Sequence, residues 1–303
     1  MRTHYWGSLP CHELSDADRE LLPLLSGLVL FRENLQGDTA ELVRSIKQLN
    51  PDIEIAIDHE GGRVNRFGQT MLLGSAQSYI DSDDEELFKA HLIHDFSYLK
   101  SLGIDRIFGP CVDINLASQG RPSRVIGELG RSYGSTYDEV GRWASIYIET
   151  AHQCGLKTCL KHFPDHGYCQ EDSHIELPQD MRVQEELAPI LAFYQKLVQQ
   201  HGIDMVMLAH FALPNITGHT ESITFDASIQ KMSPVPTITD CLGMQAISGT
   251  PTERISRAQQ AGHQHVMLTH QPADVLKRAI ESVNQSLEAA DDVVPNQSVG
   301  CSF

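Results

Sequence analysis

Apolar residues recur along the chain in two alternating patterns: short segments rich in apolar residues and one-sided helical stripes. The short segments predict seven strands, at residues 27–31, 53–57, 104–108, 156–160, 205–208, 236–239 and 266–268, of which GLVLF (27–31) is continuously apolar. Between them, apolar residues three and four positions apart predict helices; one such stripe consists of Phe88, Leu92, Phe96 and Leu99. Alternation of this kind is typical of a parallel sheet covered by crossover helices.

The number and spacing of these elements favour one closed barrel. The chain has 303 residues, a length that suits a (β/α)8 barrel without a second domain. We therefore predict a single TIM-like (β/α)8 barrel over residues 1–303, with one weak or irregular strand and a polar tail from about residue 288. A doubly wound open sheet is the alternative, but no glycine-rich dinucleotide-binding turn follows the first strand.

The acidic composition argues against nucleic acid and anionic membranes as partners. Forty acidic residues against 23 basic residues give a formal charge of −17, which would repel nucleic acid and anionic membranes. The seven cysteines include no CxxC pair, so neither a disulfide framework nor a structural zinc site is indicated. The start of the chain does not resemble a secretory signal, and no apolar run reaches 18 residues. We expect a cytoplasmic, soluble protein; its oligomeric state is not predicted.

Polar side chains gather where the predicted strands end. They are Asp58, His59, Glu60, Asp113, Lys161, His162, His210, Asp240 and His270. The carboxyl ends of barrel strands meet on one rim, where such folds place their active sites. We therefore expect these residues to share a pocket.

Five stretches resemble the family 3 glycoside hydrolases, in their β-N-acetylhexosaminidase branch. They are IAIDHEGGRVNRF (55–67), FGPCVDIN (108–115), KHFPDHG (161–167) with DSH four residues later, VMLAH (206–210) and ITDCLGM (238–244). The similarity spans roughly residues 20–275 in the order that the family has. It implies an enzyme that hydrolyses glycosides and, more narrowly, a retaining exo-β-N-acetylhexosaminidase.

The resemblance also implies roles for individual residues. Asp240 matches the nucleophile, and an ionised carboxylate is the group that can trap an oxocarbenium-like centre as a covalent glycosyl-enzyme. His174 matches the general acid/base, with Asp172 as its partner in a dyad on a mobile loop. An imidazole titrates near neutral pH, and a neighbouring carboxylate fixes its tautomer and favours the protonated form.

The remaining matches concern the substrate. Asp58, Arg66, Arg131, Lys161 and His162 match residues that bind the terminal sugar, and such donors and acceptors suit a ring of hydroxyl groups. The implied partner is a small carbohydrate containing N-acetylglucosamine, and no metal or organic cofactor is implied. Kinship further suggests peptidoglycan recycling in a bacterial cytoplasm, with muropeptide fragments as substrates.

The chain departs from the family pattern at several points. Asp165 replaces the glycine of KHFPGHG, His59 replaces the glutamine of DQEGGR, and Cys241 replaces the second aspartate of TDD or SDD. The stretch between Ser222 and Asp240 is shorter than the family implies, so an element before the nucleophile strand is expected to be irregular or missing. An apparent two-residue insertion near residue 129 makes Arg131 a weaker match than the other sugar-binding residues.

Three alternatives remain open. The loop residues His162, His166, Asp172 and His174 include enough nitrogen and oxygen ligands for a zinc hydrolase, although their spacing matches no HExxH helix. The departures are also consistent with a sugar-binding descendant that has lost catalysis. A β-glucosidase or a glycoside phosphorylase on the same scaffold is the nearest enzymatic alternative, the latter because a neutral histidine base does not repel phosphate.

Overall fold

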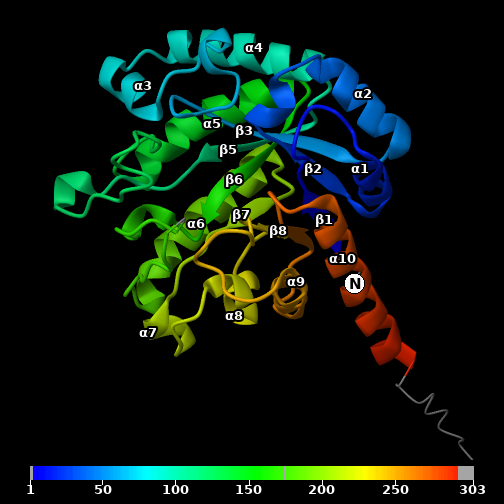
Figure 1. Ribbon diagram of the computed structural model, residues 1–303. Coiled ribbons are helices and arrows are strands. Elements are labelled where there is room, and N and C mark those ends of the chain that lie inside the picture. Colours follow the sequence, from blue (N-terminus) through cyan, green and yellow to red (C-terminus); the bar gives the residue numbers. More distant parts are fainter. Residues whose placement is uncertain (1–2, 174, 293–303) are drawn as a thin grey trace, which may run out of the picture.

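Eight parallel strands form a closed barrel in the structure, a computed structural model that describes residues 3–173 and 175–292 (Figure 1). The barrel strands are β1 His4–Gly7, β2 Gly27–Leu30, β3 Glu54–Gly61, β5 Arg106–Cys111, β6 Lys157–Phe163, β7 Val206–Leu208, β8 Thr237–Thr239 and β9 His265–Met267. Each strand pairs with the next, and β9 pairs with β1 to close the ring. A further short strand, β4 Val64–Asn65, runs antiparallel to the end of β3. The predicted TIM-like barrel is confirmed.

Helices lie outside the ring of strands, as Figure 1 shows for α2, α4, α5 and α6. The α-helices are α1 Asp16–Leu21, α2 Thr39–Leu49, α3 Ala76–Ser82, α4 Glu85–Ser101, α5 Tyr137–Gln153, α6 Gln184–His201, α7 Pro214–Thr217, α8 Ala227–Gln230, α9 Pro251–Gln260 and α10 Ala273–Asp292. Short 3₁₀ turns occur at Leu22–Leu24, Arg32–Leu35, Gly68–Thr70, Ala117–Gln119, His166–Tyr168 and Ile223–Phe225. Helix α10 extends beyond residue 287, where the apolar stripe predicts its end.

The interior of the barrel is filled by apolar side chains from all eight strands or their edges. These buried residues are Trp6, Val29, Ala56, Phe108, Cys159, Met205, Met207, Ile238 and Met267. The indole ring of Trp6 lies against Gly27, where a Cβ atom would come within 2.2 Å of the ring. Side chains therefore fill the interior of the barrel, and the space for a ligand lies at the carboxyl ends of the strands.

Strand β1 is the element that the apolar pattern missed. It has four residues, and only three of them are buried. Its partners are β2, and β9 at the other end of the chain, where Tyr5 pairs with Val266. The strand includes His4 and Gly7 and is bordered by Thr3 and Ser8, so no apolar segment marks it in the sequence, and the eighth strand is specified by pairing between distant segments.

The crossover from β7 to β8 is the irregular element. Five of the other crossovers contain a helix of 10 to 18 residues, such as the 17-residue α5, and the crossover from β1 to β2 contains the six-residue α1. This one contains only the four-residue helices α7 and α8 and the 3₁₀ turn Ile223–Phe225. The expectation of an irregular element before the Asp240 strand is confirmed.

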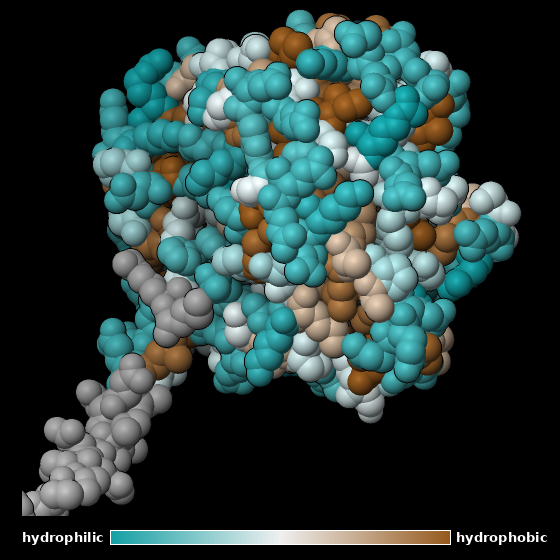
Figure 2. Space-filling view, turned by 180° about the vertical axis from the view of Figure 1, so that it is seen from behind, coloured by the Kyte–Doolittle hydropathy of each residue, from teal (hydrophilic) through white to brown (hydrophobic). Residues whose placement is uncertain are grey.

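The surface is largely polar. Figure 2 shows hydrophilic residues spread over the face opposite to that of Figure 1, with apolar residues in smaller groups between them. Within residues 3–173 and 175–292, no helix has the length and apolar character needed to span a membrane.

Candidate active site

A cavity of about 570 Å³ opens at the carboxyl ends of the barrel strands. It is lined by Val29, Phe31, Asp58, Glu60, Arg63, Val64, Arg66, Phe108, Val125, Leu129, Arg131, Lys161, His162, His166, Ser173, Met207, Asp240, Cys241, Gly243, Met244, Gln245, Met267, Thr269, His270 and Gln271. The strand-end residues that the sequence singled out therefore largely meet in one pocket. His59, Asp113 and His210 are fully buried beside it and do not line it.

Two carboxylates and a lysine form the centre of this pocket. Asp58 and Glu60 are two positions apart on β3, so their side chains leave the same face of the strand. Lys161 on β6 lies between them, with Nζ 2.7 Å from Asp58 Oδ1 and 2.6 Å from Glu60 Oε1. Only 3% of the Lys161 side chain is exposed. The ammonium group is thus held by two ion pairs in a nearly closed site.

Two arginines complete this group. Arg66 Nη2 donates to Asp58 Oδ2 at 2.7 Å. Arg131 donates through Nε and Nη2 to the two oxygens of Glu60, both at 2.8 Å, and through Nη1 to the carbonyl of Val125. We call Asp58, Glu60, Arg66, Arg131 and Lys161 the rim ion cluster. Four of its members were predicted to bind sugar, whereas Glu60 was seen at a strand end and given no role.

Ion pairs within the rim ion cluster shift the pKa values of its members so that they stay charged. Burial disfavours ionisation of Asp58, but Lys161 and then Arg66 outweigh it and lower the pKa of Asp58 to about 2. Glu60 behaves likewise: burial opposes its charge, and Arg131 and Lys161 hold its pKa well below the usual range. Burial also opposes the charge of Lys161, but Asp58 and Glu60 raise its pKa. All these groups are therefore ionised at neutral pH and present oriented donors and acceptors to a ligand.

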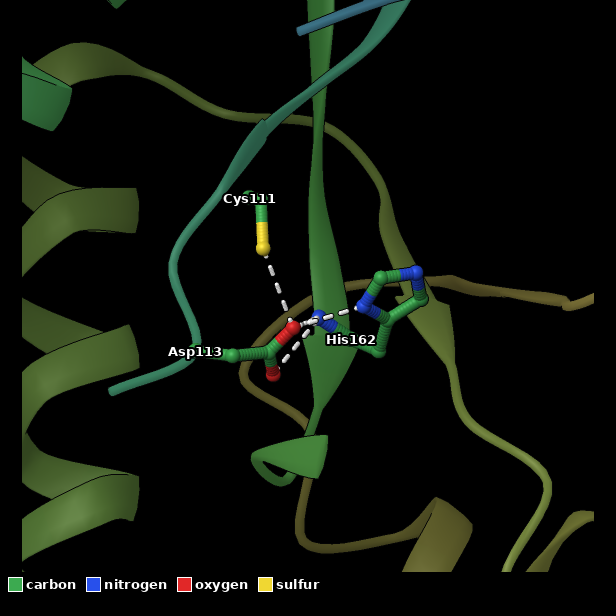
Figure 3. Close-up of side chains that lie close together, drawn as sticks. All are labelled: Cys111, Asp113 and His162. Carbon is green, nitrogen blue, oxygen red and sulfur yellow. Dashed lines mark hydrogen bonds and ion pairs between the residues drawn. The ribbon is translucent and has the colours of Figure 1, made fainter. Parts of the chain in front are cut away.

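His162 is oriented by a buried carboxylate. Its Nδ1 lies 2.6 Å from Asp113 Oδ2, and its backbone N–H donates to Asp113 Oδ1 at 3.1 Å (Figure 3). Cys111 donates its S–H to Asp113 Oδ2 at 3.2 Å. Burial disfavours ionisation of Asp113, but His162 outweighs it and lowers the pKa of Asp113 to about 2. Nε2 of His162 lies 3.4 Å from Arg131 Nη2.

Among the described residues, Cys111, Asp113 and His162 form the one group of three whose potential metal-binding atoms lie within 4.8 Å of one another. Their protons already serve the hydrogen bonds in Figure 3. Two ligand atoms of a tetrahedral zinc ion lie about 3.3 Å apart, because each bond is about 2.0–2.1 Å long. His162 Nδ1 and Asp113 Oδ2 are only 2.6 Å apart. The distances between Cys111, Asp113 and His162 therefore fit hydrogen bonds rather than zinc coordination. The alternative zinc set also includes His174, which lies outside the described residues.

Asp240 follows β8 and lines the same cavity as the rim ion cluster. Its backbone N–H donates to Leu208 O at 2.9 Å, and its Oδ1 accepts from the N–H of Cys241 at 2.7 Å. Cys241 is held in turn by Thr269, whose Oγ1 lies 2.9 Å from its Sγ. The shortened crossover therefore leaves the Asp240 side chain in the pocket.

The loop predicted to carry the acid/base dyad borders the cavity. His166 and Ser173 line it, and Asp172 is partly exposed beside Ser173. His174, the predicted proton donor, lies outside the described residues. The loop is anchored by Arg182, which pairs with Asp180 and donates through Nη2 to the carbonyl of Asp165 at 3.0 Å. Both Arg182 and Asp180 are buried, and neither was singled out from the sequence.

Asp165, which replaces a glycine of the family pattern, restricts this loop. Its φ is +116°, a region that residues with a side chain rarely adopt. The buried side chain accepts from Gly167 N–H at 2.8 Å and from Tyr137 Oη at 2.6 Å. These hydrogen bonds maintain a backbone conformation that glycine would adopt without strain.

Asp165 gives a testable pH dependence. Burial and then the nearby Asp113 raise its pKa to about 7. Aspartate in an unfolded chain has a pKa of about 3.9. Between about pH 4 and 7 the folded state therefore retains a proton on Asp165 that the unfolded state has lost. Because of this difference, Asp165 makes the free energy of unfolding fall as pH rises. Asp165→Asn mimics the neutral acid. The free energy of unfolding of the variant and of the wild type is measured in urea. The difference between them (variant minus wild type) is expected to rise by about 2–4 kcal/mol from about pH 4 to about pH 8.

Each protein needs its own pH series, because buried histidines titrate in the same range. Burial lowers the pKa of His166 and of His263 to about 4, so their contributions are lost as pH falls. Both proteins share that trend, and it cancels in the difference. A difference between variant and wild type that stays constant across the range would contradict the assignment.

His59, the second departure, is turned away from the pocket. It lies between Asp58 and Glu60 on β3, so its side chain leaves the opposite face of the strand. The ring is fully buried, and its Nε2 lies 2.9 Å from Asp95 Oδ2 of α4. Asp95 also accepts from the N–H groups of Leu72 and Leu73. The change from glutamine therefore affects packing between barrel and helix rather than the pocket.

Comparison with known proteins bears directly on this site. The glycosyl hydrolase family 3 N-terminal domain model matches residues 15–298. The chain belongs to glycosyl hydrolase family 3. A β-hexosaminidase of Haemophilus influenzae is 31% identical over 283 residues, which cover 88% of this chain and 79% of that protein. The chain is accordingly a glycoside hydrolase, as the motifs imply.

Solved structures of family 3 enzymes share the fold. NagZ from Neisseria gonorrhoeae, in complex with N-trifluoroacetyl-D-glucosamine, superposes with a TM-score of 0.80 at 27% identity over 93% of this chain and 85% of that one. A family 3 β-N-acetylglucosaminidase from Paenibacillus sp. gives a TM-score of 0.83 at 28% identity. That comparison covers 94% of this chain and 57% of the longer Paenibacillus chain.

The pairings that sequence reasoning missed have recognisable signals. Glu60 is two positions from Asp58, which places both on one face of a strand. Asp113 follows β5 in the same way that His162 ends β6, and neighbouring strand ends meet. His210 Nδ1 also lies 2.7 Å from Thr224 Oγ1 in the crossover from β7 to β8, and this pairing has no such signal, because Thr224 lies in an irregular segment.

Proposed function

We propose that the protein is a retaining, exo-acting β-N-acetylhexosaminidase that removes terminal N-acetylglucosamine from β-linked glycans. The observation that carries the proposal is the shared cavity: Asp240 lines it together with the rim ion cluster and with Ser173, which stands between Asp172 and His174. The names of the family 3 relatives and the N-acetylglucosamine analogue bound to the Neisseria enzyme support this substrate class.

The proposed first step uses Asp240 and His174. The carboxylate of Asp240 attacks the anomeric carbon, while His174 gives its proton to the leaving oxygen and Asp172 stabilises the imidazolium before transfer. The bond to the aglycone breaks as the bond to Asp240 forms. In the second step neutral His174 takes a proton from water, the hydroxide attacks the same carbon, and Asp240 leaves as a carboxylate. Two inversions give net retention.

The rim ion cluster and His162 would bind the sugar. Asp58 presents a charged acceptor, Arg66, Arg131 and Lys161 present donors, and Asp113 fixes the orientation of the His162 ring. These groups already hold one another in place, so the sugar meets oriented partners and little order has to be imposed on binding. We also propose muropeptide fragments as natural substrates and a cytoplasmic site of action, on the strength of kinship.

An aryl β-N-acetylglucosaminide tests the activity. The protein is expected to release the aryl alcohol, and proton NMR of the first-formed sugar is expected to show the β-anomer. The aryl β-glucoside and added inorganic phosphate serve as parallel arms. Faster release from the glucoside, or a sugar phosphate product, would replace the proposal with one of the enzymatic alternatives. Binding of N-acetylglucosamine without release would indicate a sugar-binding descendant.

A further inference from the structure

A chain of buried polar groups runs beneath the turn that carries Asp240. It consists of the carbonyl of Cys241, the side chain of His210, the side chain and carbonyl of Thr224, the side chain of His263 and the hydroxyl of Thr237. His210, Thr224 and Thr237 are fully buried, and His263 is 3% exposed. We call it the Thr224 chain. His210 and Thr224 belong to the crossover from β7 to β8, which lacks a long helix, whereas Thr237, Cys241 and His263 lie in or after β8.

His210 connects the crossover to the turn. Its Nε2 lies 3.1 Å from the carbonyl oxygen of Cys241, and its Nδ1 lies 2.7 Å from Thr224 Oγ1. A carbonyl only accepts hydrogen bonds, so Nε2 must carry a proton. Burial lowers the pKa of His210 against the opposing effect of Asp240, which favours a neutral ring. Nδ1 is then an acceptor. The Thr224 hydroxyl also lies 3.2 Å from the carbonyl of Ala209 and accepts from Ser222 Oγ at 3.1 Å, but its one proton goes to the nearer Nδ1, to which no other group donates in the part of the chain that the structure describes.

Thr224 is itself held from the other side. Its carbonyl accepts from His263 Nε2 at 2.9 Å, and His263 Nδ1 lies 2.8 Å from Thr237 Oγ1 on β8. The 3₁₀ turn Ile223–Phe225 is therefore tied both to strand β8 and to the residue that follows Asp240. A helix in this position would rely on apolar packing, whereas here directional hydrogen bonds set the position of the turn.

Cys241 passes this constraint to Asp240. The N–H of Cys241 donates to Asp240 Oδ1 at 2.7 Å, and the carbonyl of Cys241 accepts from His210. Any rotation of Cys241 that lengthens the bond to His210 also moves the donor that faces the Asp240 carboxylate. The orientation of that carboxylate is thereby coupled to the position of a histidine ring outside the cavity lining.

We propose that Thr224 and His210 are positioning residues for Asp240. The hydroxyl of Thr224 and the carbonyl of Cys241 hold the neutral His210 ring at its two nitrogens, the ring in turn fixes the carbonyl of Cys241, and the N–H of Cys241 then aims the carboxylate. The inference rests on the proposed role of Asp240 as the nucleophile. In this proposal, residues of the irregular crossover position the carboxylate of Asp240.

Thr224→Val and Thr224→Ser test the proposal as a matched pair. Valine has nearly the shape of threonine but has no hydroxyl, whereas serine keeps the hydroxyl. With valine, the buried Nδ1 loses its donor, and the Cys241 carbonyl alone is left to hold the ring. We expect Thr224→Val to lower kcat about 10- to 100-fold, with KM for the aryl β-N-acetylglucosaminide within about threefold, because the rim ion cluster is untouched. Thr224→Ser is expected to stay within about threefold of the wild-type kcat.

Nitrogen-15 NMR of the imidazole of His210 supplies a readout that does not depend on turnover. The wild type and Thr224→Ser are expected to show an Nδ1 signal typical of a hydrogen-bonded acceptor, and Thr224→Val an Nδ1 signal shifted by the loss of that hydrogen bond. Equal kcat values for the valine and serine variants, or an unchanged Nδ1 signal in the valine variant, would overturn the inference. If the wild type itself released no aryl alcohol, the proposed function would fail, and the Nδ1 signal would still decide whether the Thr224 hydroxyl donates to His210.

A second pair guards against a valine variant that does not fold. His210→Gln keeps an N–H that can donate to the Cys241 carbonyl, whereas His210→Leu does not. The glutamine variant is expected to retain at least about ten times the kcat of the leucine variant. Equal activity of the two would show that the hydrogen bond to Cys241 contributes nothing to the position of Asp240.

Discussion

Replacement of Asp240 by alanine is expected to lower kcat for an aryl β-N-acetylglucosaminide by about 10⁴-fold or more. Without the carboxylate no glycosyl-enzyme forms, and the positive charge that develops at the anomeric carbon has no anion beneath it. The measurement is the rate of aryl release at saturating substrate. Sugar binding is expected to persist, because the rim ion cluster forms its contacts without Asp240.

Sodium azide sharpens this experiment. A small anion can enter the space left by the Asp240 side chain and attack the anomeric carbon, so azide is expected to restore part of the rate and to yield the α-glycosyl azide. Asp274→Ala is the matched control, since Asp274 is an exposed residue on α10 that pairs with Arg278. More than about 1% of the wild-type kcat in Asp240→Ala would remove Asp240 from the nucleophile role.

Replacement of Lys161 by methionine is expected to reduce the free energy of unfolding by about 3–5 kcal/mol and to abolish turnover. Methionine has a similar length and no charge, so Asp58 and Glu60 would remain buried beside each other without the ammonium group that now lies between them. Urea unfolding measures the first effect. Binding of N-acetylglucosamine, followed by calorimetry, is expected to weaken along with the activity.

Lys157→Met provides the comparison on the same strand. The Lys157 side chain is 59% exposed and pairs with Glu54 at 3.2 Å and Asp204 at 3.9 Å on the opposite end of the barrel. Exposed pairs contribute little, so its loss is expected to change stability by less than about 1 kcal/mol. Similar losses for both variants would mean that the ion pairs of Lys161 are no stronger than surface pairs.

The sequence predicted the barrel because its strands and helices are locally encoded. Four of residues 53–57 are apolar, and the stripe from Phe88 to Leu99 lies on one face of α4. Strand β1 was missed because its four residues are specified by partners elsewhere in the chain. Local pattern therefore predicts elements with an apolar period, whereas elements fixed by distant pairing escape it.

The candidate site was predictable to a similar extent. Strand ends located Asp58, Lys161 and Asp240, because the topology of a barrel brings those ends together. Which side chains pair is a different matter: Lys161 meets Asp58 across 103 positions of sequence. Such pairing depends on strand order and side-chain direction. Arg131, the weaker match on account of the apparent insertion, nevertheless reaches the pocket through its bidentate bond to Glu60.

The Thr224 chain also has a consequence for how this protein can change over generations. A helix packed on a barrel tolerates many exchanges among apolar residues of similar size. Hydrogen bonds between two histidines, two hydroxyl groups and two carbonyls permit very few, because each donor needs its own acceptor. Where a packed helix would tolerate many apolar exchanges, this crossover is expected to accept at Thr224 and His210 only residues that keep the same donor or acceptor.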